Sequence, residues 1–506
     1  MRQVRGSTDH VVIVGAGLGG LAAALHLVAA GRRVTICEAE AIPGGRAGQW
    51  KRAGYRIDTG PAVLTMPELL SDALAGVGER LEDWLPLQRL DPAYRAFFAD
   101  GSRLDIRDTS EGTEEEIRRV CGAREAAGYR RFERFSTRMY KYQFNSFIDR
   151  NYDSPLGALA PDLARLIAAG GLRKLAPKTA SYFRDSRTRK IFTFQAMYAG
   201  LAPTEALALY SVISYMDCVA GVWFPTGGMH AVPQALAAVA EKHGVRIEYN
   251  TRISRVEMAG QRATAVITEA GERIAADVVV LNPDLPLAYR DLLGHEPARL
   301  RRLRYSPSCV LLLNGSTRAY PELAHHNIHF GTEWERTFHE LMVQGKVPTD
   351  PSFFVARPTA SDPALAPDGK SIYYVLFPVP NDTSGIDWQR RTASYREEIG
   401  RVLDARGYPG FDAAVEVEDV VTPQQWRERG FAAGTPFSAA HTFGQTGPFR
   451  PGNLYGENVV FTGCGTHPGV GVPMVLISGR LAADRIVGRT AARARRVVMQ
   501  AEGSRA

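Results

Sequence analysis

A short glycine-rich run near the N-terminus has the residue types and spacing that bind a dinucleotide. Residues 15–20, GAGLGG, match G-x-G-x-x-G and follow the apolar run 10–14 directly. In this motif the first glycine permits a tight turn, the second lets the backbone approach a pyrophosphate, and the third lets helix and strand pack closely. The N-terminus of the following helix stabilises phosphate charge. We therefore predict a dinucleotide site that includes Gly15, Gly17 and Gly20.

The acidic residue Glu38 stands where such a site needs a ribose ligand. It ends a predicted strand, residues 34–38, which follows a helix predicted over residues 18–30. A carboxylate at the end of this second strand can accept hydrogen bonds from ribose hydroxyls. We therefore add Glu38 to the predicted cofactor site.

Two glycine-containing loops follow, and they favour FAD over NAD as the dinucleotide. They are PGGR at residues 43–46 and DTGP at residues 58–61. Glycines let the chain run close to a flavin diphosphate, and the arginine offers donors to it; a surface salt bridge is the alternative role of this arginine. The chain has no second G-x-G-x-x-G, which disfavours reductases that carry FAD and NADPH on paired folds. The predicted contacts are Gly45, Arg46, Gly60 and Pro61.

The elements that position these residues indicate an open α/β sheet. The apolar run, the helix and the strand described above form one βαβ unit. Further strands are predicted near 245–249, 253–258, 277–281 and 458–462, with helices around 230–242 and 475–486. The predicted fold class is therefore α/β, with a Rossmann-like FAD-binding lobe assembled from three discontinuous segments and an inserted mixed α+β substrate lobe.

A chain of 506 residues is too long for one compact core, so we divide it into lobes. The middle is richer in charge, tyrosine and phenylalanine, and its pattern is more helical. The predicted divisions are FAD-binding segments at 9–65, 223–300 and 451–489, a helical, membrane-facing substrate lobe at 66–222, a mixed substrate lobe at 301–450 and a flexible basic tail at 490–506.

Composition and charge exclude several classes of protein. The five cysteines form no CxxC pair, which argues against a zinc site, a redox disulfide or a secreted disulfide framework. The formal net charge of +7 fits solubility or attraction to anionic lipids, and no basic run interleaved with aromatics points to nucleic acid. The histidines form no pattern typical of a metal site. The apolar stretch 11–31 is interrupted by glycines and is predicted as strand, turn and helix, not as a signal peptide or a membrane span.

Several motifs together resemble one family. The fingerprint followed by GGR and a D-x-G-P loop is similar to the flavin amine oxidase superfamily. Two stretches narrow the resemblance to carotenoid desaturases: GVWFPTGGM at 221–229 and FTGCGTHPGVGVP at 461–473, the second similar to the signature of bacterial phytoene desaturases. HHNI at 325–328 and DPALAPDG at 362–369 match that family too. The resemblance covers the chain from residue 10 to about residue 488.

This resemblance implies a cofactor and a reaction. It implies that the chain binds FAD and desaturates phytoene, to lycopene or a partly desaturated carotene, in carotenoid biosynthesis. It also implies that Gly465 and the turn formed by Val472, Pro473 and Met474, which opens the last helix, contact the flavin. Backbone N–H groups at such a turn point at the electron-rich pyrimidine edge of the flavin ring.

Three places depart from the pattern of the resembled family: Cys464, the step Ser478-Gly479-Arg480, where the family commonly has small-Ala-Lys, and an inserted-looking break at 452–458. Cys464 stands where the family commonly has alanine, and Arg480 stands where it commonly has lysine. We interpret Cys464 as a small packing residue, since free cysteine behaves as a small hydrophobic side chain. These departures do not affect the predicted flavin site.

One helix-spaced pair is predicted to assist acid–base chemistry. Asp162 and Arg165 share a helix face at i, i+3 spacing, and the resembled desaturases carry D-x-x-R at a comparable place in the substrate cavity. A surface salt bridge is the alternative role. Apolar residues on the same helix, with the basic residues of 173–178 beyond it, are predicted to rest on a membrane surface; a core-facing helix is the alternative.

The predicted reaction places few demands on side-chain chemistry. An apolar tunnel must hold a long hydrocarbon beside the flavin, which accepts a hydride while a proton leaves the neighbouring carbon. We expect a carotenoid hydrocarbon as substrate, oxygen or a quinone as electron acceptor, no metal and no nucleic acid. The expected location is cytoplasmic, peripheral on the inner face of the membrane. Alternatives are a desaturase of a later carotene or of a shorter squalene-like polyene, a non-catalytic prenyl-binding protein on the same fold, and an amine oxidase.

Overall fold

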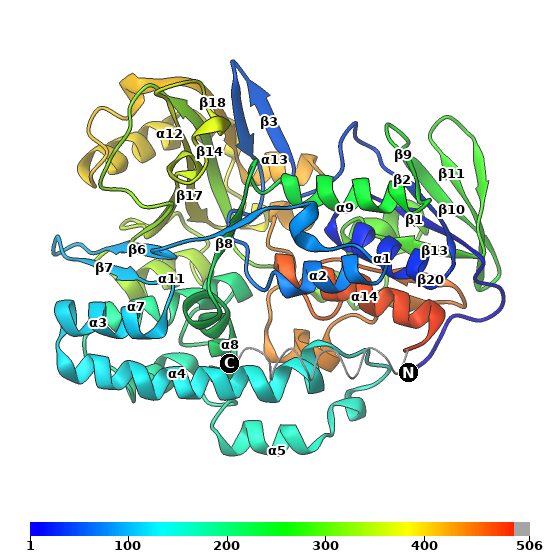
Figure 1. The fold of residues 1–506 in the computed structure, drawn as a ribbon, viewed down its shortest axis with the longest axis horizontal. Coiled ribbons are helices and arrows are strands. Elements are labelled where there is room, and N and C mark those ends of the chain that lie inside the picture. The colour runs from blue at the N-terminus through cyan, green and yellow to red at the C-terminus, as the bar shows by residue number, and fades with distance from the viewer. Residues whose placement is uncertain (490–506) are drawn as a thin grey trace.

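Strand β1 (His10–Val14) lies in the middle of a six-stranded sheet (Figure 1). In this computed structural model, which describes residues 1–489, the strand order is β19–β20–β13–β1–β2–β9, parallel except for β19 against β20. Val11 and Ile13 pack toward helix α1 (Leu18–Ala29), whereas Val12 and Val14 pack on the opposite face. Burial on both faces explains why this strand is apolar throughout. The other strands are β2 (Arg33–Cys37), β9 (Arg246–Glu248), β13 (Val278–Leu281), β19 (Leu454–Tyr455) and β20 (Val459–Phe461).

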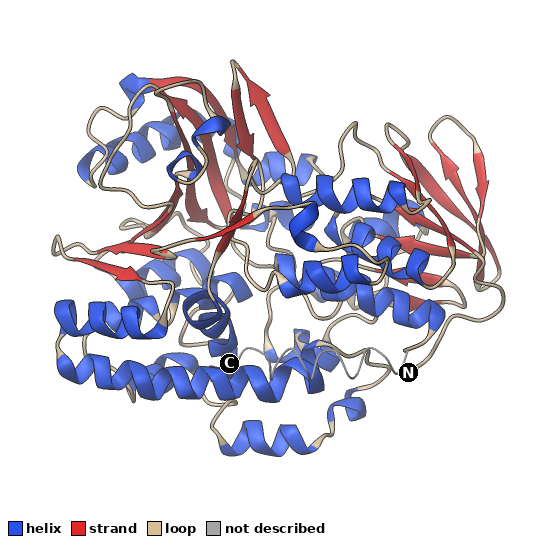
Figure 2. Cartoon of the chain, in the orientation of Figure 1, coloured by secondary structure: helices blue, strands red, loops and turns tan. Residues whose placement is uncertain are grey.

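Helices cover one face of this sheet, and a small antiparallel sheet packs against the other (Figure 2). Helix α1 contacts α2 (Glu68–Ala75), α9 (Ala231–Lys242) and α14 (Val472–Val487). The contact of α1 with α14 is close, since a Cβ at Gly479 would lie 2.8 Å from the Cβ of Ala22. The small sheet consists of β10 (Ile253–Ala259), β11 (Arg262–Thr268) and β12 (Arg273–Ala275).

The predicted α/β fold class is confirmed. The six-stranded sheet draws its strands from residues 10–37, 246–281 and 454–461, and the chain between them builds the rest of the molecule. The three segments meet because β13 pairs with β1 on one side and with β20 on the other. The carboxyl ends of these parallel strands therefore lie at one edge of the sheet, where open α/β sheets bind their ligands.

A second sheet of seven strands separates a helix from a cavity. In β17 (Ser371–Val379), Tyr373, Val375 and Phe377 pack in one cluster with helix α12 (Trp388–Ala405), while Tyr374 and Leu376 point to the other face and line the cavity. The strand order is β18–β14–β17–β16–β15–β6–β7, antiparallel except for β15 with β6. The bounds are β14 (Ser308–Ser316), β15 (His326–His329), β16 (Phe353–Ala356), β18 (Val415–Val421), β6 (Tyr94–Phe97) and β7 (Arg103–Ile106).

A layer of helices closes the cavity opposite this sheet and forms the lower part of Figure 1. Its members are α3 (Ser110–Cys121), α4 (Ala123–Gln143), α5 (Pro161–Ala168), α6 (Leu175–Ala180), α7 (Ser186–Ile191) and α8 (Ser211–Tyr215). Helix α8 continues into a π-helical turn, η6 (Met216–Ala220). Three short strands, β5 (Leu87–Arg89), β6 and β7, lie within the segment predicted as a helical lobe, and β6 and β7 extend the seven-stranded sheet.

The remaining elements connect the two large sheets. They are the hairpin β3 (Gln49–Arg52) and β4 (Tyr55–Asp58), the strand β8 (Trp223–Pro225), which pairs with β5, and the helices α10 (Leu285–Leu287), α11 (Trp334–Met342) and α13 (Pro423–Glu428). The basic tail predicted at 490–506 lies outside the described residues.

Candidate active site

The turn between β1 and α1 has a geometry that only glycine tolerates. Gly15 has a φ of +99°, and a Cβ at Gly17 would lie 2.5 Å from Oδ1 of Asn282. A Cβ at Gly20 would collide with the carbonyl oxygen of Gly15. Gly15 and Gly17 line a large cavity, whereas Gly20 holds α1 against β1. The first backbone N–H groups of α1 therefore remain free to bind an anion in this cavity.

Glu38 lines the same cavity at the end of β2. Its carboxylate accepts hydrogen bonds from the backbone nitrogens of Ala16 at 2.6 Å and Glu40 at 2.9 Å. Burial raises the pKa of Glu38, although these N–H groups oppose the shift. The side chain is therefore fixed beside the glycine turn, as a ribose-binding carboxylate must be.

Arg46 carries hydrogen-bond donors that the protein leaves unused. Its Nε and Nη2 atoms are buried and have no hydrogen-bond partner among residues 1–489. The guanidinium lies 3.5 Å from Oδ2 of Asp284 and stacks 4.5 Å from the ring centre of Phe431. Because buried donors without partners are costly, a ligand acceptor in the adjoining cavity would satisfy Arg46. The neighbouring Gly45 lines this cavity too.

The loop that contains Gly60 and Pro61 is held by the seven-stranded sheet on one side and by the turn that opens α9 on the other. Tyr374 of the seven-stranded sheet donates a hydrogen bond of 2.8 Å to the carbonyl oxygen of Gly60. Asp58 accepts from the backbone nitrogens of Met229 at 2.7 Å and His230 at 3.0 Å, and burial raises the pKa of Asp58 to about 6. A Cβ at Gly60 would collide with the carbonyl oxygen of Arg46. Gly60 thus presents backbone without a side chain to the cavity, and Pro61 lines the cavity beside it.

The C-terminal motif brings a second helix N-terminus to this cavity. Val472, Pro473 and Met474 form the first turn of α14 and line the cavity, so their position agrees with the sequence-based prediction. Gly465, predicted alongside them, does not line it. Its Cα faces Leu285, where a Cβ would collide with the Leu285 side chain. The neighbouring Gly463 and Cys464 line the cavity instead.

The sequence analysis missed residues that follow the central strand β13. Asn282 and Asp284 line the cavity directly after β13 and face the glycine turn and Arg46, respectively. A signal was present, since residues at the carboxyl end of a predicted central parallel strand are candidates for ligand contact. The predicted strand 277–281 ends directly before Asn282, so the carboxyl end of that strand marks both residues.

The cavity continues from the dinucleotide end into an apolar tunnel. Its volume is about 1580 Å³, and side chains from the seven-stranded sheet, the helical layer and the loop 436–449 line the tunnel. Phe194, Met197, Ile213, Phe330, Phe354 and Leu376 are among them. An interior of this kind suits a long hydrocarbon, because binding then depends on buried apolar area and shape. One carboxyl group, Asp217, lines it as well and was not predicted.

Asp162 and Arg165 form an ion pair on α5, with Nη1 of Arg165 2.9 Å from Oδ1 of Asp162. The Arg165 side chain is 64% exposed. Neither residue belongs to the cavity lining found within residues 1–489, although Leu163, Leu166 and Ile167 of the same helix do. The geometry agrees with the alternative of a surface salt bridge, and a catalytic role of the pair stays a prediction.

Five exposed apolar side chains lie in or next to the cavity lining: Leu159, Ile167, Leu172 and Phe443 line it, and Leu156 follows the lining residue Pro155. We call these five residues the mouth patch. Leu159 is 71% exposed and Phe443 61%, and both also line the cavity. Large apolar side chains exposed along one cavity mark an interaction surface.

Two further observations concern metal ligands and membrane-spanning helices. Within residues 1–489 no group of three or more His, Cys, Asp or Glu side chains could hold a metal ion. Over the same residues, no helix has the length and apolar character needed to cross a membrane.

The chain is similar to known flavoproteins over nearly its whole length. The family model for flavin-containing amine oxidoreductases matches residues 18–487. A phytoene dehydrogenase of Streptomyces griseus is 54% identical, over 98% of this chain and 98% of the relative. Two Myxococcus xanthus proteins, a zeta-carotene-forming phytoene desaturase and an all-trans-zeta-carotene desaturase, are 38% and 34% identical, covering 94% and 95% of this chain and 93% of each relative.

Solved structures support the fold independently. A putrescine oxidase superposes with a TM-score of 0.60, covering 96% of this chain and all of that chain, at 15% identity. This likeness concerns the fold alone, because the identity is low. A cavity with a glycine cradle, unused arginine donors and a long apolar extension can hold a dinucleotide at one end and an apolar molecule at the other.

Proposed function

The chain belongs to the family of flavin-containing amine oxidoreductases, and on this premise we propose that it desaturates phytoene in carotenoid biosynthesis. It is an FAD-dependent oxidoreductase that acts on CH–CH bonds. The single observation that carries the choice of substrate is the continuous cavity from the glycine cradle to an apolar tunnel. A hydrocarbon offers no polar handle, so its recognition requires such a tunnel.

The described residues fit FAD at one end of the cavity. Gly15, Gly17 and the first turn of α1 would hold the pyrophosphate, with Glu38 on the ribose and Gly20 keeping helix and strand together. Arg46 would use its unpartnered donors on the cofactor. When bound, FAD supplies a hydride acceptor for the substrate.

The ring of the cofactor would lie between two loops that approach each other in the fold. Gly45 and Gly60 offer backbone without a side chain on one side, next to Pro61. Val472 and Met474 offer N–H groups of the first turn of α14 on the other side, whereas Pro473 between them has none. Gly465 would instead let the chain pass close to Leu285 of α10. The apolar tunnel would then hold a carbon–carbon bond against the ring. Proximity and orientation would supply most of the lowering of the reaction barrier.

We further propose that the mouth patch contacts a membrane surface, because a substrate dissolved in lipid must enter the tunnel there. Lys174 and Lys178 follow α5 closely and would favour anionic headgroups. In this proposal the protein is cytoplasmic and peripheral on the inner face of the membrane. Oxygen or a membrane quinone would accept the electrons. Flotation with liposomes, with and without anionic lipid, tests the contact.

The identity of the product is also a proposal, because the names of relatives at 34–38% identity give different substrates and products. Lycopene or a partly desaturated carotene is the expected product, and a later carotene is the alternative substrate. The test is the pigment profile, by chromatography and absorbance, of a host that makes phytoene and expresses this chain. Coloured carotenes that disappear with Gly17→Val support the proposal. Unchanged phytoene in the presence of flavin-loaded protein would show that the substrate is wrong.

A further inference from the structure

One buried carboxyl group inside the tunnel, that of Asp217, lacks the hydrogen bonds that usually accompany burial of a carboxyl group. Asp217 lies in the π-helical turn η6, is 4% exposed and lines the cavity. Its Oδ2 atom finds no hydrogen-bond partner in the described part of the chain. The hydroxyl of Tyr94 approaches the carboxyl group without meeting full hydrogen-bond geometry. Burying a carboxyl group in this way costs several kcal/mol if it is charged, so its presence needs a reason.

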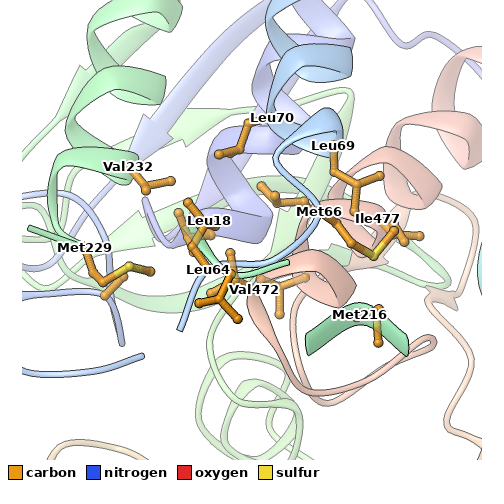
Figure 3. Close-up of a cluster of buried hydrophobic side chains, with 14 of the residues drawn as sticks. Leu18, Leu64, Met66, Leu69, Leu70, Met216, Met229, Val232, Val472 and Ile477 are labelled. Carbon is orange, nitrogen blue, oxygen red and sulfur yellow. The ribbon is translucent and has the colours of Figure 1, made fainter. Parts of the chain in front are cut away.

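The fold places Asp217 near the predicted position of the flavin ring. Met216, the residue before it, belongs to one buried cluster with Leu64 and Val472 (Figure 3). Leu64 follows the loop of Gly60 and Pro61, and Val472 begins α14. The turn η6 therefore belongs to the same buried region as both elements that we propose to hold the ring. Trp223, just after η6, donates a backbone hydrogen bond of 2.8 Å to Leu64 and fixes this arrangement.

Among the titratable groups that the structure describes in this part of the tunnel, Asp217 is the one that can change charge near neutral pH. Its titratable neighbours are Tyr94 of β6, Tyr198 and the adjacent Cys218. Burial holds the pKa of each of these three groups well above its usual range, so they stay protonated at neutral pH. Burial also raises the pKa of Asp217 to about 7, and the nearby Tyr94 opposes the shift only in part. Such a value suits a group that gains and loses a proton in turnover.

Substrate binding does not account for this carboxyl group. A pure hydrocarbon has no donor to offer Asp217, although Phe194, Met197 and Met216 of the same cavity lining would suit its apolar body. Desaturation, however, releases a proton from carbon in a space that excludes water. The reaction therefore needs a base inside the tunnel, whereas binding of the substrate does not.

We propose that the carboxylate of Asp217 accepts the proton that leaves the substrate during desaturation, a role that rests on the proposed function. One C–H bond breaks with transfer of its hydrogen and electron pair to the bound flavin. The C–H bond on the adjacent carbon breaks toward Asp217, and its electron pair becomes the new π bond. Asp217 is then neutral. The acceptor that reoxidises the cofactor, oxygen or a quinone, takes up two electrons and two hydrogens, one of them the proton held by Asp217.

The test compares three variants of the full, FAD-loaded chain: Asp217→Asn, Asp217→Glu and the control Glu125→Gln. Glu125 is equally buried, at 4% exposure, in the same helical layer but does not line the cavity. Anaerobic loss of the visible flavin absorbance after mixing with phytoene reports the first turnover. We expect Asp217→Asn to bind FAD and phytoene normally but to reduce its flavin about 100-fold or more slowly. Asp217→Glu should recover part of the rate, and Glu125→Gln should match the parent.

The pH profile separates a base from a structural residue. The parent rate should rise with pH through an inflection near 7, which Asp217→Asn should lose. An Asp217→Asn variant that keeps the parent rate and inflection would overturn the proposal. If phytoene fails to reduce the parent flavin while another polyene succeeds, the proposed substrate is wrong. The same three variants, measured with that polyene, then decide the role of Asp217.

Discussion

The guanidinium of Arg480 lies 2.7 Å from the carboxylate of Asp149, and both side chains are almost fully buried. Arg480 also lies 2.7 Å from a carboxylate oxygen of Asp72. Because Arg480 belongs to α14, this pair joins the last element of the nucleotide lobe to the start of the segment that leads to α5. The position where the resembled family commonly has lysine thus holds a cation that bridges two carboxylates, which the forked guanidinium suits.

Removing this buried cation should destabilise the protein strongly. We expect Arg480→Met to lower the free energy of unfolding by about 3–5 kcal/mol, since Asp149 would stay buried without its partner. The urea midpoint, followed by tryptophan fluorescence, measures this. Arg273→Met is the matched control, because its pair with Glu257 is solvent-screened and should contribute little to stability. Equal midpoints for the two variants would contradict the assignment.

A side chain at Gly17 should block the cofactor without unfolding the chain. In Gly17→Val the Cβ would lie 2.5 Å from Oδ1 of Asn282, and the branched methyls would point into the proposed pyrophosphate site. We expect a purified protein without yellow colour and with FAD content below about a tenth of the parent. Gly452→Ala should retain its flavin, because a Cβ there meets open space. A yellow Gly17→Val protein would show that FAD binds elsewhere.

Loss of the Arg46 donors should weaken FAD binding and leave the fold intact. Charge-assisted hydrogen bonds contribute about 1.5–3 kcal/mol, so Arg46→Met should raise the Kd for FAD by roughly 10- to 150-fold. Equilibrium dialysis of the apoprotein measures this. Arg89→Met serves as control, since Arg89 also lies over an aromatic ring, that of Trp223, but does not line the cavity. An unchanged Kd would remove Arg46 from the cofactor site.

The free energy of unfolding should depend on pH through the protonation of Asp217. Its pKa is higher in the folded protein, at about 7, than the ordinary aspartate value of 3.8, so the folded state binds the proton more tightly. Stability contributed by this group is therefore complete below pH 3.8 and falls as pH rises toward 7. Asp217→Asn should lack this loss and be more stable than the parent above pH 7, by up to roughly 4 kcal/mol. Urea midpoints of both proteins across this range give the difference, and parallel curves would contradict it.

A charged residue in the mouth patch should release the protein from membranes. Leu159 is 71% exposed, so Leu159→Glu should leave the thermal midpoint nearly unchanged. We expect it to lower the liposome-bound fraction several-fold and the carotene yield in a phytoene-producing host. Val343→Glu is the matched control, at 72% exposure beyond α11 and outside the cavity lining. Equal flotation of the parent and Leu159→Glu would exclude this patch as the membrane contact.

The sequence by itself determined the parts of this protein that depend on neighbouring residues along the chain. The turn at Gly15 and Gly17, the carboxylate Glu38 and the helix opening at Val472 each follow from local rules for strands, turns and helix ends. Apolar strands separated by helices were sufficient to predict the α/β fold class and its assembly from three segments.

Only the tertiary structure decided which distant residues share the cavity. Asp217 lies in a stretch of sequence without a recognisable motif, and only the fold shows that it is buried and lines the cavity. Conversely, the i, i+3 pair of Asp162 and Arg165 has the spacing of an interacting pair, yet the rotation of α5 turns its leucines toward the tunnel. A helix period tells which residues share a face, but the direction of that face is set by packing against elements far along the chain. For this reason the sequence was sufficient to select Gly15, Gly17 and Glu38, which line one cavity, whereas the proposed base Asp217 had to come from the fold.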